Sequence, residues 1–160
     1  MSVKYQTIAQ SAVDYVRSKM TVGALNKLGD VIGSGGKSVI CVMAERSVTR
    51  EWSSLQTESY LRRVAAAAEN TGCGNCGEQS AIAFVYLLDR RVRPIDWMAL
   101  QKPGDHNFVV VGRVSGSDDT DPATWGPTAI VCDPWKSKVY PPNMLIPMWK
   151  HKPFMHYRAE

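Results

Sequence analysis

A cysteine between a glycine-rich turn and an apolar run is the feature of this sequence best suited to chemistry. Residues 70–76 read Asn-Thr-Gly-Cys-Gly-Asn-Cys, and residues 81–88 form an unbroken apolar run. A run that is apolar all round predicts a buried helix, which we expect over residues 76–89. Cys76 would then begin that helix, where unpaired backbone N–H groups lower the pKa of a thiol. This position predicts a nucleophilic thiolate.

Two further residues could form a catalytic group with Cys76. His106 lies two residues before a strand predicted over 108–113, and Asp133 directly follows a strand predicted over 128–132. If these strands are antiparallel neighbours, the start of one lies beside the end of the other. His106 and Asp133 would then meet at one edge of the sheet. An attacking thiolate, an imidazole that moves the proton and a carboxylate that orients the imidazole make a cysteine hydrolase.

The remaining segments predict an α+β domain, with N-terminal helices and a central buried helix packed on a small antiparallel sheet. Apolar periodicity predicts helices over residues 5–28 and 47–69, with a flexible glycine-rich connector at 33–38. Residues 39–43 fit either a strand or a helix. Further strands are expected over 92–100 and 138–140. Prolines predict an irregular tail, at positions 141, 142, 147 and 153.

Length and charge narrow the class of protein. The 160 residues are expected to form one domain, 1–160, that buries its own core. No run reaches the roughly 18 apolar residues of a membrane span, and no secretory signal core is recognisable at the start. Much of the net charge of +4 lies after residue 135. Because no nucleic-acid motif accompanies these basic residues, we expect a solvated face rather than a nucleic-acid site.

The four cysteines are Cys41, Cys73, Cys76 and Cys132. A chain of this size does not need a disulfide framework, so we expect mostly free thiols. Cys73 and Cys76 form a C-x-x-C pair, which leaves a redox pair or a zinc ligand pair as an alternative. Cys73 is otherwise a turn residue or a disulfide partner.

The three candidate residues and their surroundings resemble the papain family of cysteine hydrolases. In that family a glutamine lies six positions before the nucleophile, where this chain has Asn70, and a Cys-Gly-Ser-Cys turn leads into the helix. Asp133-Pro134-Trp135 is similar to the family's Asn-Ser-Trp, whose tryptophan covers the bond to histidine. The compact order within residues 70–135 more closely resembles small bacterial papain-fold effectors and toxins, which include cysteine proteases and glutamine deamidases.

The sequence also departs from the family pattern. Gly77 replaces the tryptophan that follows the papain nucleophile, and Asn70 is one methylene shorter than glutamine. The spacing from Cys76 to His106 is far shorter than in papain. An aspartate in the position of Asp133 is the pattern of the effector group and of transglutaminases.

The resemblance implies a role for each matched residue. Cys76 would be the nucleophile, His106 the general base and then acid, and Asp133 the residue that orients the imidazole. Trp135 would cover the His106–Asp133 bond, and Asn70 with the Cys76 backbone N–H would form the oxyanion hole. No metal and no organic cofactor is implied.

The implied substrate is a protein, met in a host or competitor cell after delivery by a specialised secretion system; otherwise the protein is cytoplasmic. Glutamine deamidation and selective proteolysis both remain open. The only spare chain expected near the site is the loop 115–127 and the tail around Trp149. The rival hypothesis is a non-enzymatic interaction module with a structural or redox C-x-x-C. No oligomeric state is predicted.

Overall fold

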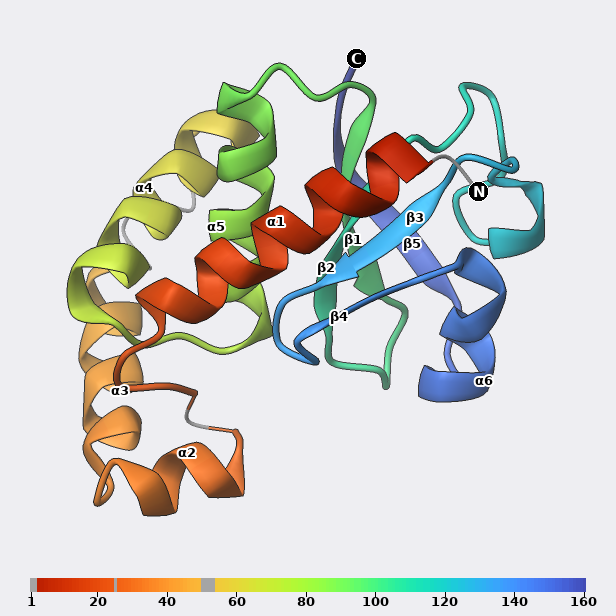
Figure 1. The fold of residues 1–160 in the computed structure, drawn as a ribbon. Helices are drawn as coiled ribbons and strands as arrows, with labels where there is room; N and C mark the ends of the chain where they lie inside the picture. Colours follow the sequence, from red (N-terminus) through yellow and green to blue (C-terminus); the bar gives the residue numbers. More distant parts are fainter. Residues whose placement is uncertain (1–2, 25, 50–53) are drawn as a thin grey trace.

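The apolar run at residues 81–88 lies in the middle of a buried helix, α5 (Cys76–Asp89). The helix begins with a capping box, in which Asn75 and Glu78 satisfy each other's backbone N–H groups. Ile82, Phe84 and Leu87 are fully buried. The helix predicted over 76–89 is therefore confirmed. In the computed structural model, which describes residues 3–24, 26–49 and 54–160, this helix lies at the centre of an α+β fold (Figure 1).

Within the described ranges, four α-helices precede α5: α1 (Val3–Lys19), α2 (Leu28–Gly33), α3 (Lys37–Thr49) and α4 (Thr57–Thr71). The single helix predicted over 5–28 is wrong, because α1 ends at Lys19. Gly23 has a φ of +96°, which a helix cannot include, and its N–H binds the carbonyl of Gly72 instead. Residues 39–43 are helical, as part of α3. The helix predicted over 47–69 corresponds to the end of α3 and to α4, with residues 50–53 outside the described part.

In the part of the chain that the structure describes, five strands form one sheet in the order β4-β3-β2-β1-β5, and every neighbouring pair is antiparallel. The strands are β1 (Ile95–Leu100), β2 (Asn107–Val111), β3 (Ile130–Asp133), β4 (Lys138–Tyr140) and β5 (Pro153–Ala159). Four of them correspond to the predicted strands. The prediction of an irregular tail was wrong for residues 153–159, because these residues form β5 and pair with β1. Pro153 is the first residue of β5, where a proline is tolerated in a strand.

The two faces of the sheet are covered by different elements. On one face Val109, Val111 and Cys132 pack in a core with residues of α1, α4 and α5. On the other face Phe108 and Val110 pack in a second core, which includes Leu145 of the short helix α6 (Leu145–Trp149). Figure 1 shows α1 crossing in front of the sheet, with α4 and α5 to the left of the strands and α6 to their right. No helix of the described ranges is long and apolar enough to cross a bilayer.

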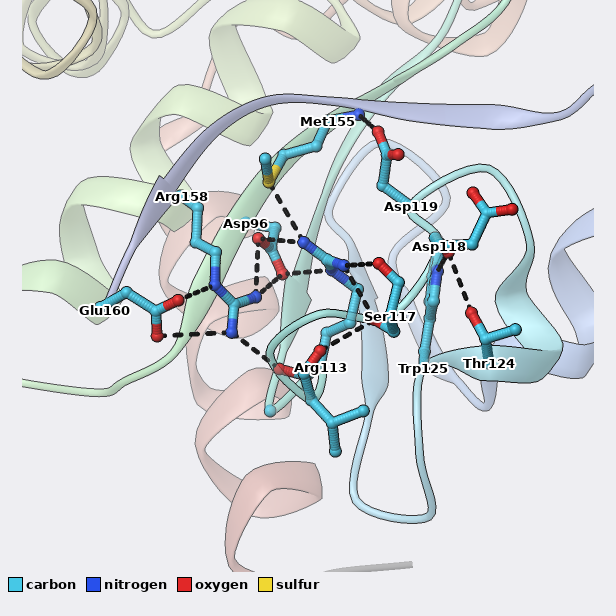
Figure 2. Close-up of polar contacts among 12 residues, drawn as sticks. Asp96, Arg113, Ser117, Asp118, Asp119, Thr124, Trp125, Met155, Arg158 and Glu160 are labelled. Carbon is cyan, nitrogen blue, oxygen red and sulfur yellow. Dashed lines mark hydrogen bonds and ion pairs between the residues drawn. The ribbon is translucent and has the colours of Figure 1, made fainter.

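A buried ionic cluster fixes one end of the sheet (Figure 2). The carboxylate of Asp96, at the start of β1, is fully buried and accepts hydrogen bonds from two arginines. Arg113 follows β2 and donates at 3.0 and 3.1 Å, and Arg158 of β5 donates to both oxygens at 3.0 Å. The cluster joins three strands at the end of the sheet opposite the start of β2.

Candidate active site

The turn before α5 is built around two glycines. Gly72 has a φ of +73° and ends α4 with its N–H on the carbonyl of Ala68, a left-handed cap that glycine adopts without strain. Gly74 lies so close to α5 that an added Cβ would be 2.6 Å from the Cβ of Glu78. These two positions let the chain reverse after α4 and enter α5 at Cys76.

Side chains from two helices support this turn. Glu78 Oε2 accepts the Asn75 N–H at 2.8 Å, and the same carboxylate pairs with Arg46 of α3 at 2.9 Å. Gln79 donates from Nε2 to the carbonyl of Gly74 at 2.8 Å. The start of α5 is therefore held both by its own first turn and by α3.

Cys76 is a buried thiol, 6% exposed, rather than a resting thiolate. Burial is the main cause that raises its pKa, and the carboxylates of Asp105 and Glu78 raise it further. The backbone N–H groups of Asn107 and Gly77 act in the opposite direction by hydrogen bonding to the sulfur. The predicted lowering of the pKa was wrong, because loss of hydration outweighs the N–H groups available at the start of the helix.

His106 and Asp133 lie together at the end of the sheet. His106 Nε2 is 2.8 Å from Asp133 Oδ2, and both side chains are buried. The antiparallel register that pairs Val109 with Cys132 brings the start of β2 beside the end of β3. Because a carboxylate only accepts hydrogen bonds, Nε2 carries the proton of this bond. Nδ1 is then the basic nitrogen of the neutral ring.

Asp133 is fixed by further donors. Tyr140 donates its hydroxyl to Oδ2 at 3.1 Å, and the Lys136 N–H donates to Oδ1 at 3.1 Å. Trp149 Nε1 lies 3.2 Å from the Tyr140 oxygen and donates to it. Burial and the charge of Asp133 raise the pKa of Tyr140, so the phenol keeps its proton and remains a donor. The carboxylate is therefore held in one orientation toward the imidazole.

Two tryptophans surround the His106 ring. Trp149 stacks on it with ring centroids 3.9 Å apart, and Trp135 meets it edge-on at 5.7 Å. Trp135 is itself anchored by its Nε1, which donates to Asn26 Oδ1 at 2.8 Å. Trp149, rather than the predicted Trp135, lies closest to the ring. Sequence reasoning missed the roles of Trp149 and Tyr140, for which the only signal was the aromatic content of the tail.

An added Cβ at Gly77 would lie 3.8 Å from Asn107 Oδ1, so the first turn of α5 lies beside the start of β2, directly after His106. Asn70 is the predicted site residue for which the structure shows no contact with the other four among the described residues. It lies exposed in the last turn of α4, and within the described ranges it makes no hydrogen bond with the other four predicted residues. Asn75, which directly precedes Cys76, is buried.

The loop 115–127 lies away from the candidate site, contrary to expectation. It joins the end of β2 to the start of β3, whereas His106 and Asp133 lie at the opposite ends of these strands. The other expected segment, the tail around Trp149, does contact the His106 ring.

The expectation of mostly free thiols was wrong for two of the four cysteines. Cys41 and Cys73 form a disulfide with Cα atoms 6.1 Å apart, while Cys76 and Cys132 are free and buried. The bond links α3 to the turn, two segments whose approach has no local signature in the sequence. It removes Cys73 from the predicted pair with Cys76. Within the described residues, no three His, Cys, Asp or Glu side chains are grouped to bind a metal.

No protein-family model matches this sequence, and no curated protein matches it significantly. A thiol, a histidine oriented by a carboxylate and a helix N-terminus are the groups that acyl transfer through a covalent intermediate requires.

Proposed function

We propose that this chain is a papain-like cysteine hydrolase that attacks amide bonds of proteins. The observation that supports it best is the buried 2.8 Å hydrogen bond between His106 and Asp133. Asn107, the residue after His106, lies beside Gly77, the residue after Cys76. In the proposal Cys76 is the nucleophile, His106 the proton carrier and Asp133 the residue that orients it.

The reaction begins from a neutral thiol, since burial raises the pKa of Cys76. As the sulfur attacks the carbonyl carbon, its proton passes to Nδ1 of His106. The backbone N–H of Cys76, which has no partner within its helix, stabilises the oxyanion. The C–N bond breaks, the leaving nitrogen takes the proton from His106, and a thioester remains. Water then attacks the thioester, gives its proton to His106, and releases the acid and the Cys76 thiol.

The burial of the site favours a narrow substrate. Cys76 and His106 are 6% and 3% exposed, and the loop 115–127 supplies no wall at this end of the sheet. A single projecting carboxamide suits such a site better than an extended peptide bound on both sides of the sulfur. We therefore favour glutamine deamidation of a folded protein over selective proteolysis.

The Cys41–Cys73 disulfide supports the proposed route of the protein. Disulfides persist mainly in oxidising compartments and are rare in cytosolic proteins. We propose a bacterial effector or toxin that leaves its own cell and acts on a protein of a host or competitor cell.

The test is to incubate the protein with cell lysate and to follow ammonia release, glutamine-to-glutamate conversion and new protein N-termini by mass spectrometry. Ammonia release that is lost in Cys76→Ala and kept in Cys132→Ala is expected. Cys132 is the matched control, because it is the other buried free thiol and belongs to the core beneath α1.

New N-termini without ammonia, lost in Cys76→Ala, would make the protein a protease and overturn the preference for deamidation. If no sample contains a product whose formation depends on Cys76, the hydrolase is contradicted. That outcome would favour the interaction module, in which the disulfide is structural.

A further inference from the structure

The two sulfurs of the Cys41–Cys73 disulfide differ in access. Cys41 lies on α3 and is half-buried, whereas Cys73 has no exposed surface. A thiolate attacks a disulfide along the line of the S–S bond, so it needs access to the sulfur that it attacks. An external thiol can therefore reach Cys41, and Cys73 is the sulfur that would leave.

The leaving sulfur faces a carboxyl group. Glu45 of α3 is 6% exposed, and its Oε2 lies 3.4 Å from the Cys73 sulfur. Its other oxygen, Oε1, is buried without a hydrogen-bond partner among the described residues. A buried carboxylate with an unpaired oxygen is costly, which favours the neutral acid.

The hydroxyl of Thr71 fixes the position of the Glu45 carboxyl. Thr71 Oγ1 lies 2.9 Å from Glu45 Oε2 and 3.0 Å from the carbonyl oxygen of Ala67. A hydroxyl has one proton to donate, and the carbonyl can only accept it. This proton is shared between the two acceptors, and its donation to Glu45 Oε2 holds that oxygen beside the Cys73 sulfur while favouring the charged form of the carboxyl.

We propose that Cys41, Cys73 and Glu45 form a thiol–disulfide exchange site, in which Glu45 is the acid for the departing Cys73 sulfur and the substrate is a small thiol. This inference does not rest on the proposed hydrolase.

The exchange has two balanced steps. The thiolate of the small thiol attacks the Cys41 sulfur, the S–S bond breaks, and a mixed disulfide forms on Cys41. The Cys73 sulfur leaves with the electron pair and takes the proton of Glu45, which becomes a carboxylate and later recovers a proton from solvent. A second small thiol then attacks the mixed disulfide, frees Cys41 as a thiol and is oxidised with the first to a disulfide.

Burial has a larger effect on the pKa of Glu45 than the charges of its neighbours do. Burial raises the pKa of Glu45 to about 7, and the charge of Glu78 raises it as well. The hydrogen bond from Thr71 and the charge of Arg46 act in the opposite direction. Below this pH the acid is present; above it a carboxylate faces the departing sulfur and opposes its negative charge.

The experiment is to reduce the oxidised protein with glutathione from pH 6 to 8.5, quench with acid, and locate the adducts by peptide mass spectrometry. The observed rate constants are divided by the concentration of glutathione thiolate, so that the ionisation of glutathione does not contribute to the pH dependence. In the wild type, we expect the adduct on Cys41 and a rate constant that falls as the pH rises through about 7. Glu45→Gln keeps the shape but has no acid proton, so its rate constant should be flat and at least about tenfold below that of the wild type at pH 6.

Two variants complete the test. Glu45→Asp retains a carboxyl and should retain the pH slope. Glu69→Gln is the matched control, because Glu69 hydrogen-bonds to Tyr15 instead, and it should behave as the wild type. An adduct on Cys73 of the wild type would overturn the proposal, as would the same rate constant and slope in Glu45→Gln as in the wild type. If Glu45→Gln does not fold, the adduct position and the Glu45→Asp slope still decide the matter.

Discussion

One nitrogen of His106 is committed to Asp133, and this fixes which nitrogen can accept a proton. Asp133 accepts three hydrogen bonds, from His106, Tyr140 and the Lys136 N–H. It offers only lone pairs to these neighbours, so the imidazole must keep its proton on Nε2. In the proposed reaction, Asp133 would act through the imidazole tautomer that it selects.

Asp133→Asn should disrupt that choice. If the asparagine NH₂ group pointed toward Lys136, two hydrogen-bond donors would face each other, because the Lys136 backbone N–H donates at this position. The flipped amide would present NH₂ to His106 and move the imidazole proton to Nδ1. We expect about 10²–10⁴-fold lower hydrolase activity in the proposed reaction. Nitrogen-15 NMR of the ring should show the Nε2–H tautomer in the wild type and its loss in the variant. An unchanged tautomer would contradict this account.

The pH dependence of Cys76 reactivity follows from its burial. A raised pKa means a smaller thiolate fraction at each pH than in an ordinary thiol. In the oxidised protein, alkylation of Cys76 by iodoacetamide should be slow at neutral pH and still increase above about 8.5, the ordinary thiol value. Fast alkylation that is constant between pH 6 and 8 would contradict a raised pKa.

Asp105→Asn provides an internal control for this profile. Asp105 is exposed, and its carboxylate raises the pKa of Cys76. Removing the charge should shift the alkylation profile to lower pH without a change in the melting temperature. An unchanged profile would mean that Asp105 does not act on the sulfur.

At the scale of elements, the sequence predicted the helices and strands that are determined by local sequence patterns. The bounds of α5 follow from a capped apolar run, and β2 and β3 follow from β-branched runs that lead to His106 and away to Asp133. Their antiparallel pairing could be predicted because β2 and β3 are consecutive strands in the chain.

Long-range packing could not be predicted in this way. β5 contains no clear alternation and pairs with β1, more than fifty residues earlier. The bond between Cys41 and Cys73 depends on how α3 packs near the turn. The sign of the Cys76 pKa shift depends on burial, which competes with the helix N-terminus and is set by the whole core.

Glu45 makes the attachment of α3 sensitive to pH. In the folded protein its pKa is raised from 4.5 to about 7. Between these values the folded state retains a proton that the unfolded chain loses, so the free energy of unfolding falls as the pH rises. The loss amounts to about 3 kcal/mol between pH 4.5 and 7.

Glu45→Gln stays neutral and should avoid this loss. Urea unfolding of the oxidised proteins at pH 5 and pH 8 is the measurement. The variant should match the wild type at pH 5 and be more stable at pH 8, while Glu69→Gln keeps the pH dependence of the wild type. Equal stability of Glu45→Gln and wild type at both pH values would mean that folding does not raise the pKa of Glu45.

At the scale of the whole molecule, the sheet has two chemically different ends. One carries the candidate site at the start of β2 and the end of β3, and the other carries the cluster of Asp96, Arg113 and Arg158 (Figure 2). The cluster holds the C-terminal strand β5, which completes the sheet at one edge. The ends should respond independently, because changes at distant sites usually have additive effects.

Asp96→Asn and Arg158→Met test this separation. Removing the Asp96 charge leaves the buried guanidinium of Arg113 and the partly buried guanidinium of Arg158 without their shared anion, which should cost about 3–5 kcal/mol of unfolding free energy. Arg158→Met leaves Asp96 paired with Arg113, whose Nε and Nη2 both donate to it, and methionine retains the apolar length of the arginine stem. Its cost in urea unfolding should be clearly smaller. In both folded variants the His106 ring should keep its Nε2–H tautomer, since the hydrogen bonds of Asp133 lie at the other end. A change of tautomer in Arg158→Met would show that β5 connects the two ends, because β5 begins shortly after Trp149, the residue stacked on His106.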